Sequence, residues 1–237
     1  MIALHQSQFL PWVPYFFKVI KTDTFVVLDD VQFQKNGVQN RNKIKTLKGD
    51  QWLTVPVSAT LGTPINRVTI EGECYKKILK TLEHNYKKAP YFNEVYAVVE
   101  SAFKRNNEHL HDINKELFAG FLGLLDVQTQ IHYSSELDTK ESKDDLVIEI
   151  IKKFGQSEYL SGKGALAYMD LEKFRREGIE VHTYDFAYSP YPQLWTRETG
   201  FIPDLSMLDL MCNDLPNARE YVLRNGVLKK LSERVSL

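Results

Sequence analysis

Two short apolar runs near the start of the chain, residues 2–4 and 25–28, each lead into hydrogen-bonding side chains. About 20 residues separate the runs, which is enough for one helix, so the pair is typical of a βαβ unit with parallel strands. In parallel sheets, ligands bind outside the carboxyl ends of the strands. The residues that follow the two runs are therefore expected at one edge of a sheet: His5, Gln6, Gln8, Asp29, Asp30 and Gln32.

Apolar residues recur at three- and four-residue spacing through the middle of the chain, which predicts helices. These periodic segments are residues 75–82, 94–104 and 108–125, with a break at 89–92. β-rich or alternating runs predict strands at 51–57, 66–70, 130–133, 158–165 (ending in a glycine-bearing loop) and 179–186. Residues 39–45 predict a polar loop or a short strand, and further helices are expected at 142–154, 171–177 and 206–211.

Strands that alternate with helices at this spacing favour an α/β fold. We expect a parallel-sheet core of nucleotide-binding type, formed by residues of about 1–72 and 126–237. A mostly helical insertion or subdomain is expected at about 73–125. The 237 residues are thus predicted to form one domain, 1–237.

The balance of charged residues and the spacing of the two cysteines exclude some classes of protein. Lys and Arg (30) balance Asp and Glu (31), which argues against a protein that coats nucleic acid. Cys74 and Cys212 have neither CxxC spacing nor a partner cluster, so we expect unpaired thiols in a reduced cytoplasm. No apolar run reaches the roughly 18 residues of a membrane-spanning helix, and the start of the chain lacks the basic region of a signal peptide.

His5 is the first candidate for chemistry. A histidine at the end of a buried strand suits a general base or a phosphate ligand near neutral pH, and the alternative is a bond to neighbouring backbone. Asp29 and Asp30 could bind a cation, orient an amine or a sugar hydroxyl, or hold Arg41 in a structural role. Adjacent strand residues point to opposite faces, so only one of these aspartates is expected to enter a site.

Two further polar segments suit an anion. Asn40-Arg41-Asn42 with Lys45 offers two amides, a guanidinium and an ammonium to a phosphate or carboxylate, and a solvated loop is the alternative. Ser161 and Lys163 flank a glycine after a predicted strand, without the full spacing of a phosphate-binding P-loop. His84, His109, His111 and His132 lack the spacing of zinc ligands, so no metal site is predicted there.

Longer motifs also run through the chain. They comprise His5-Gln6-x-Gln8-Phe9-Leu10-Pro11-Trp12-x-x-Tyr15-Phe16-x-Lys18, Leu28-Asp29-Asp30-Val31-Gln32-Phe33, Gln39-Asn40-Arg41-Asn42-Lys43-Ile44-Lys45-Thr46, Trp52-Leu53-Thr54-Val55-Pro56-Val57, Tyr159-Leu160-Ser161-Gly162, and residues 201–210. Together these motifs resemble the WbqC-like protein family of bacteria over nearly the whole chain. Pro14 stands where the family pattern has glycine and Ser7 where it has proline, so the turn after residue 5 departs from that pattern.

The resemblance implies a transferase of bacterial surface-polysaccharide (O-antigen, lipopolysaccharide) precursor biosynthesis. It implies that glycine or another acyl group is joined to an amino sugar, with a nucleotide-activated amino sugar as the small-molecule substrate. Two alternatives stay open: a non-catalytic module that binds a nucleotide-sugar or assembles enzymes of the pathway, and a nucleotidyl-transferring enzyme. Because amide formation requires an activated carboxyl group, either ATP with a divalent cation or a preactivated donor is expected.

If the strand ends converge, the polar groups share one pocket. We expect His5, Gln8, one of the two aspartates and Arg41 to line it. The catalytic candidates are His5, Asp29 and Asp30, and the substrate-binding candidates are Gln6, Gln8, Tyr15, Gln32, Asn40, Arg41, Asn42, Lys45, Ser161 and Lys163.

Overall fold

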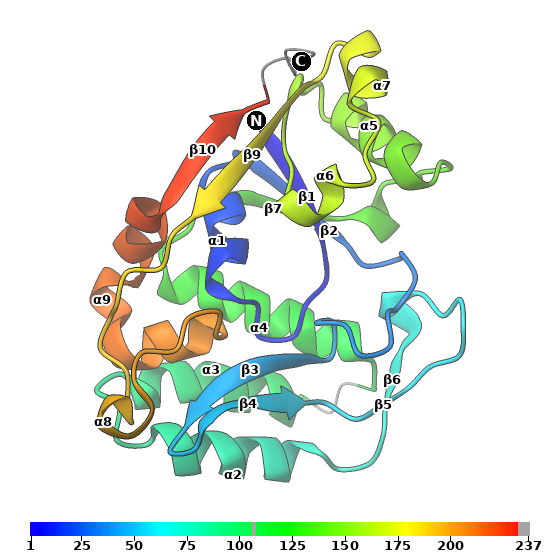
Figure 1. Cartoon of the computed structure of the whole chain (residues 1–237). Helices are drawn as coiled ribbons and strands as arrows, with labels where there is room; N and C mark the ends of the chain where they lie inside the picture. Colours follow the sequence, from blue (N-terminus) through cyan, green and yellow to red (C-terminus); the bar gives the residue numbers. More distant parts are fainter. Residues whose placement is uncertain (106–107, 232–237) are drawn as a thin grey trace.

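A six-stranded, mostly parallel sheet forms the centre of the fold (Figure 1). The computed structural model describes residues 1–105 and 108–231. The strand order is β10-β9-β8-β1-β2-β7, and every neighbouring pair is parallel except β10 with β9. The strands are β1 (Ile2–Gln6), β2 (Thr24–Leu28), β7 (Gln130–Tyr133), β8 (Glu158–Leu160), β9 (Glu180–Phe186) and β10 (Gly226–Lys230). The chain is therefore a mixed α/β protein, as its alternating pattern predicts.

β1 and β2 are neighbouring parallel strands, which confirms the prediction made from the two apolar runs. Their register pairs Ile2 with Thr24 and Gln6 with Leu28. β1 also pairs with β8, so it is an interior strand of the sheet. Its side chains are buried on both faces, Ala3 on one and Ile2 and Leu4 on the other. A strand buried on both faces needs an unbroken apolar run, and this explains why its pattern does not alternate.

Strand alternation divides the core into two apolar clusters. Ile2 and Leu4 join the cluster that contains residues of α5 (Lys143–Lys153) and α7 (Leu171–Arg176). Ala3 joins the cluster on the opposite face, which is built from α1 (Val13–Ile20), α4 (Leu110–Leu124) and α9 (Met207–Asn225). His5 shares the face of Ala3, whereas Gln6 shares the face of Leu4.

The middle of the chain is helical, as the apolar spacing predicts. It contains α2 (Tyr75–Tyr86), α3 (Phe92–Lys104) and α4. Two small antiparallel sheets accompany these helices, β3 (Arg41–Thr46) with β4 (Gly49–Thr54) and β5 (Val57–Ser58) with β6 (Thr69–Ile70). In Figure 1 this group lies below the six-stranded sheet. The remaining short helices are α6 (Lys163–Leu166), α8 (Thr196–Thr199) and two 3-10 turns, Ile65–Arg67 and Ser134–Glu136.

Three segments differ from the sequence prediction. The 3-10 turn takes up the first part of the strand predicted at 66–70. The helix predicted at 206–211 continues as α9 to Asn225, with non-helical backbone at Asp214 just before Pro216. Proline removes a donor and crowds the preceding turn, so the helix kinks there without ending. β10 was not predicted, because Val227 and Leu228 are exposed on an edge strand and do not form a buried run.

Two further expectations concern the cysteines and membranes. Cys74 and Cys212 are both free thiols, as predicted. Among the described residues, no helix combines the length and the apolar character needed to cross a bilayer.

Gly226, at the start of β10, lies directly against the Phe17 ring of α1. A Cβ atom on Gly226 would come within 2.1 Å of Phe17 Cδ2, and Phe17 is fully buried. We expect Gly226→Ala to lower the free energy of unfolding by about 1–3 kcal/mol through overpacking. Denaturant unfolding measures the change.

Gly123→Ala provides the matched control for this substitution. Gly123 is an exposed residue of α4, and nothing lies within 4 Å of a Cβ atom added there. The same chemical change should therefore stabilise the protein by about 0.5–1 kcal/mol through helix propensity. Equal effects of the two substitutions would contradict the close contact of Gly226 with α1.

Candidate functional site

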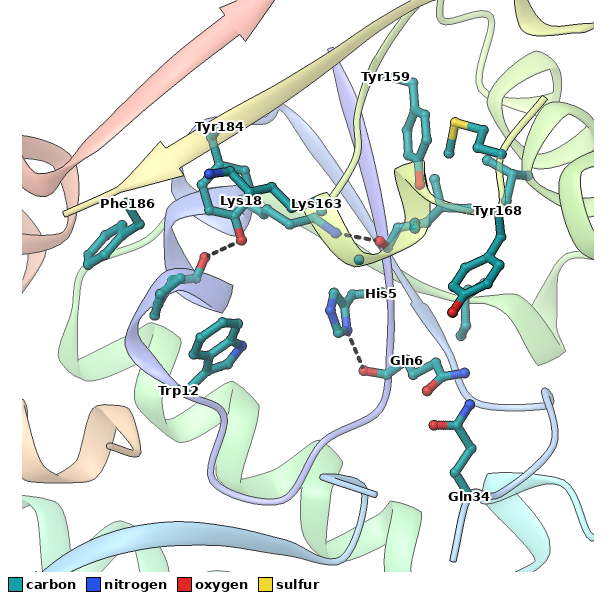
Figure 2. A pocket seen from close by; sticks show the side chains of 18 of the residues that line it. His5, Gln6, Trp12, Lys18, Gln34, Tyr159, Lys163, Tyr168, Tyr184 and Phe186 are labelled. Atoms are coloured by element: carbon teal, nitrogen blue, oxygen red, sulfur yellow. Dashed lines mark hydrogen bonds between the residues drawn. The ribbon is translucent and has the colours of Figure 1, made fainter. Parts of the chain in front are cut away.

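A cleft of about 1240 Å³ opens beyond the carboxyl ends of β1, β8 and β9 (Figure 2). This is larger than a typical small-molecule pocket, which holds about 300–1,000 Å³. Its aromatic lining comes from Trp12, Tyr159, Tyr168, Tyr184, Phe186 and Tyr188. Its polar and charged lining comes from His5, Gln6, Lys18, Gln34, Lys143, Asp144, Lys163 and Asp204. The cleft can therefore stack planar or sugar rings and bind anionic groups in one space.

His5 ends the buried part of β1 and enters the cleft from the face that α1 covers. Its ring packs edge-on against Tyr15, with the ring centroids 4.8 Å apart. Nδ1 lies 3.3 Å from both the Gln6 carbonyl oxygen and Gln8 Nε2. Burial, and after it the charge of Lys18, lower the pKa of His5 to about 3. The imidazole is therefore neutral at physiological pH and acts through hydrogen bonds.

Lys18 of α1 is the most deeply buried charged group of the cleft, with 1% of its surface exposed. Its Nζ donates to the Leu4 carbonyl oxygen at 2.7 Å. Burial lowers the pKa of Lys18 to about 7, because the apolar surroundings penalise the ammonium form. Figure 2 shows its amine reaching from α1 toward β1, close to His5.

The helix that carries Lys18 is held against the sheet by a tyrosine of the cleft. Tyr184 of β9 donates from its hydroxyl to the Pro14 carbonyl oxygen at 3.2 Å. Its ring packs on Phe17 of α1, with centroids 5.1 Å apart. Pro14 occupies the first turn of α1, where the missing backbone N–H has no helical partner to lose. The first turn of α1 is thus fixed relative to β9.

Asp29 does not face the cleft. It is 2% exposed and accepts hydrogen bonds from Ser135 Oγ at 2.6 Å, the Ser135 amide at 3.0 Å and Ser134 Oγ at 3.1 Å. Burial by itself would raise the pKa of Asp29, but these hydrogen bonds and the nearby His111 together lower it. Asp30 is exposed and accepts from Ser134 Oγ. The Asp29 carboxylate thus already accepts hydrogen bonds from the protein. These bonds connect the end of β2 to the turn after β7.

The side chains of Ser7, His111 and Asp29 are arranged as in the catalytic triad of a serine hydrolase, with the histidine between the serine and the aspartate. Ser7 Oγ lies 3.0 Å from His111 Nδ1, and His111 Nε2 lies 3.5 Å from Asp29 Oδ2. All three side chains are buried, and the adjoining cavity holds only about 10 Å³. A cavity of that volume holds about one water molecule, so it has no room for a substrate carbonyl group next to Ser7. The three residues form a structural network that joins β1, β2 and α4.

The polar segment from Asn40 to Lys45 lies in and beside the β3–β4 hairpin, outside the cleft. Asn40 Nδ2 donates to the Val55 carbonyl oxygen at 2.9 Å, and Asn42 Nδ2 donates to that of Leu10 at 2.8 Å. The Arg41 guanidinium lies 4.4 Å from the centroid of the Trp52 ring. Lys45 Nζ is directed inward, to Gln193 Oε1 at 2.8 Å. The polar side chains of this segment therefore contact other parts of the protein and do not line the cleft.

The structure therefore does not bring the predicted set into one pocket. His5, Gln6 and Lys163 line the large cleft. Gln8 and Tyr15 sit behind His5 and line the 10 Å³ cavity instead. Gln32 is exposed on the surface, and Ser161 is fully buried with its hydroxyl bonded to the Gly162 carbonyl oxygen at 3.3 Å.

A separate polar cluster lies on β8 and β9. Glu158, Glu180 and His182 place possible ligand atoms within 4.8 Å of one another. Lys230 forms an ion pair with Glu180, and His182 Nε2 lies 3.2 Å from Glu158. An ammonium group thus already neutralises part of this cluster, and none of these residues lines the cleft.

Comparison with known proteins identifies the family. A model of the WbqC-like protein family matches residues 6–221. The chain belongs to the WbqC-like protein family. It is also 31% identical over 226 residues to the uncharacterized protein Rv1507c of Mycobacterium tuberculosis, covering 93% of this chain and 96% of that protein. No solved structure matches the chain significantly.

In this WbqC-like protein, sequence reasoning missed several residues of the cleft. Lys18 belongs to the first family motif, and a lysine at a core-facing position of an apolar helix was the available signal. Tyr184 and Phe186 come from alternating positions of one predicted strand. Gln34 belongs to a turn, and nothing in the sequence indicated that the turn reaches the cleft.

Lys45 of this WbqC-like chain belongs to a buried network around Asp209 of α9. The Asp209 carboxylate accepts from Tyr191 OH at 2.8 Å, Tyr86 OH at 2.9 Å and Gln193 Nε2 at 3.0 Å. Burial raises the pKa of Asp209 to about 6, although these bonds and the charge of Lys45 oppose the rise. The network joins the β3–β4 hairpin to α9.

This raised pKa predicts a pH dependence of stability. The ordinary pKa of an aspartate is about 3.9, so between about pH 4 and pH 6 the folded state binds more protons than the unfolded state. The contribution of Asp209 to the free energy of unfolding therefore rises as the pH falls. Relative to Asp209→Asn, which does not titrate, the wild type should gain roughly 1 kcal/mol between about pH 7.5 and pH 5. Denaturant unfolding of both proteins tests this, and a constant or shrinking difference would contradict it.

Proposed function

We propose that this WbqC-like protein is a transferase whose cleft binds a nucleotide-activated amino sugar and that an acyl group, glycine in the first instance, is joined to the sugar amine. This step belongs to the biosynthesis of a surface-polysaccharide precursor of the O-antigen kind. The observation that carries the proposal is the cleft at the carboxyl ends of β1, β8 and β9, with aromatic walls and three lysines.

The position of the cleft supports a nucleotide-binding role for the α/β core. Parallel sheets bind ligands outside the carboxyl ends of their strands, and the cleft lies at that edge. Its volume of about 1240 Å³ has room for a base, a diphosphate and a sugar together. Trp12, Tyr168 and Phe186 line the cleft and are at least partly exposed, so they offer ring faces or edges for stacking.

His5 takes the part of an orienting group in this proposal. Its lowered pKa leaves the imidazole neutral, so it can hold the attacking amine or a phosphate oxygen by a hydrogen bond without adding charge. The reaction forms a C–N bond at the acyl carbon and breaks the bond from that carbon to its activating group, which leaves with the bonding electrons, while the proton that the amine loses passes to the solvent. Holding the two reactants in line is the contribution that a rigid cleft makes to such a step.

Asp29 and Asp30 have a weaker claim to a catalytic role than His5. The Asp29 carboxylate is bonded to two serines, so recruiting it for a divalent cation would break existing hydrogen bonds. The carboxylates that line the cleft are Asp144 of α5 and Asp204 of the loop before α9. If ATP with a divalent cation activates the donor, these are the groups in position to bind the cation.

A non-catalytic nucleotide-sugar-binding module is the competing function. The strongest argument for it is that the pKa of His5, which burial lowers to about 3, lies far below neutral pH, so the imidazole is poorly matched to the task of a general base. Such a module would bind the same ligand in the same cleft and release it unchanged.

Turnover separates the two functions. We expect the purified protein, incubated with ATP, glycine and a panel of nucleotide-amino sugars, to form an amide that mass spectrometry detects. His5→Ala should lower kcat/KM at least about tenfold, since a hydrogen bond to the reacting group is lost. Its Tm should stay within a few degrees of the wild type.

Lys43→Ala is the control, because Lys43 pairs with Asp50 on the β3–β4 hairpin outside the cleft. It should leave turnover unchanged. Binding of a nucleotide-sugar without any product would favour the binding module. A loss of turnover in Arg41→Ala with full activity in His5→Ala would move the site to the hairpin.

A further inference from the structure

Lys18 is buried without a counter-charge. Its Nζ uses one of three donor positions, to the Leu4 carbonyl oxygen, and no carboxylate among residues 1–105 and 108–231 lies within ion-pair distance of it. The other fully buried lysine, Lys45, differs in this respect. Lys45 has two acceptors and lies in the field of Asp209. An isolated buried ammonium is strongly disfavoured. In the free protein, the Lys18 amine therefore lacks both a counter-charge and acceptors for two of its three donor positions among the described residues.

Lys18 lines the cleft, with 1% of its surface exposed. It reaches from α1 toward β1 at the level of His5 (Figure 2). His5 is neutral and can complete a contact with the same ligand atom. The two donor positions of Lys18 that the protein leaves unused are the ones that an anion bound in the cleft would meet, and a cation in apolar surroundings binds an anion more strongly than one in water.

We propose that Lys18 is the anion receptor of the cleft, that it binds a phosphate oxygen of a nucleotide diphosphate, and that this binding is coupled to the uptake of one proton by its amine. The nucleotide identity of the ligand rests on the proposed function. The proton comes from the buffer, converts the neutral amine to the ammonium, and leaves the ligand chemically unchanged. Lys143 and Lys163 line the same cleft, and the ammonium of Lys163 is ion-paired with Asp185. The charge of Lys143 adds to that of Lys18, which favours the two charges of a diphosphate over a single carboxylate.

The pKa of the Lys18 amine in the free protein is about 7, and this value determines the pH above which ligand binding is accompanied by proton uptake. A bound anion raises that pKa, so at about pH 8 binding takes up nearly one proton, while at about pH 6 the amine is already protonated and uptake vanishes. Affinity should fall by up to about tenfold per pH unit above pH 7.

The neighbouring titratable groups do not produce this signature. His5 has a pKa of about 3, and Tyr159 and Tyr184, which face the cleft from β8 and β9, have pKa values of about 12. None of the three changes charge between pH 6 and pH 8. The remaining charged side chains that line the cleft are Lys143, Lys163, Asp144 and Asp204.

Isothermal titration calorimetry with a panel of UDP-, dTDP-, GDP- and ADP-sugars tests the proposal. Their diphosphates are esterified at both ends and do not titrate between pH 6 and pH 8. Titrations in Tris and in HEPES, which differ in ionisation enthalpy, give the number of protons taken up. We expect uptake near one at about pH 8 and near zero at about pH 6 for the sugar that binds.

Three variants test whether the Lys18 amine is the group that takes up the proton. Lys18→Met, which is close in length and removes a buried charge, should fold with an unchanged or higher Tm, bind at least about tenfold more weakly at pH 7 and take up no proton. Lys18→Arg should bind with an affinity that no longer depends on pH, because arginine stays charged. Lys163→Met, which removes an exposed cation of the same cleft, should keep the proton uptake.

Each other outcome counts against the proposal. Tight binding without proton uptake, or uptake that persists in Lys18→Met, would overturn the role of Lys18 and leave the proposed function standing. Binding by no member of the panel would overturn both.

Discussion

The parallel pairing of β1 with β2 on one side and β8 on the other is the constraint on which the cleft depends. It brings the carboxyl ends of these strands to one edge, where the chain leaves β1 and returns as α1. Because side chains alternate along a strand, His5 is directed to the face that α1 covers. There it meets Tyr15 and comes close to Lys18 of the same helix. A slip of one residue in the β1 register would reverse this face and remove both contacts.

The turn between β1 and α1 needs support from elsewhere in the chain. Leu10 has a φ of +44°, a left-handed conformation that strains a residue with a branched side chain. Asn42 of β3 donates to the Leu10 carbonyl oxygen, and the Met207 amide of α9 donates to that of Pro11. The hairpin and α9 therefore hold the turn in place. The polar motif around Asn42 thus supports the cleft at a distance instead of lining it.

The sequence was sufficient for most of the fold because the decisive patterns are local. Unbroken apolar runs identified β1 and β2, and three- and four-residue spacing identified α2 to α4. It was insufficient for the site because the destination of a polar side chain depends on contacts between distant segments. Asp29 meets Ser134 and Ser135, more than a hundred positions away, and no spacing near Asp29 indicates them. Lys18, by contrast, could have been recognised as a lysine in an otherwise apolar helix.

The two fully buried lysines show how a structural charge and a functional one can be told apart. Lys45 donates to Gln193 Oε1 and to the Gly200 carbonyl oxygen and lies in the field of the Asp209 carboxylate, so its partners are present without a ligand. Lys18 has a single carbonyl partner, and burying an ammonium in this way costs on the order of several kcal/mol. A methionine of similar length would avoid that cost. A fold that contains this lysine therefore accepts lower stability at a position where its core meets the cleft, which is the pattern expected of a group whose partner arrives with the ligand.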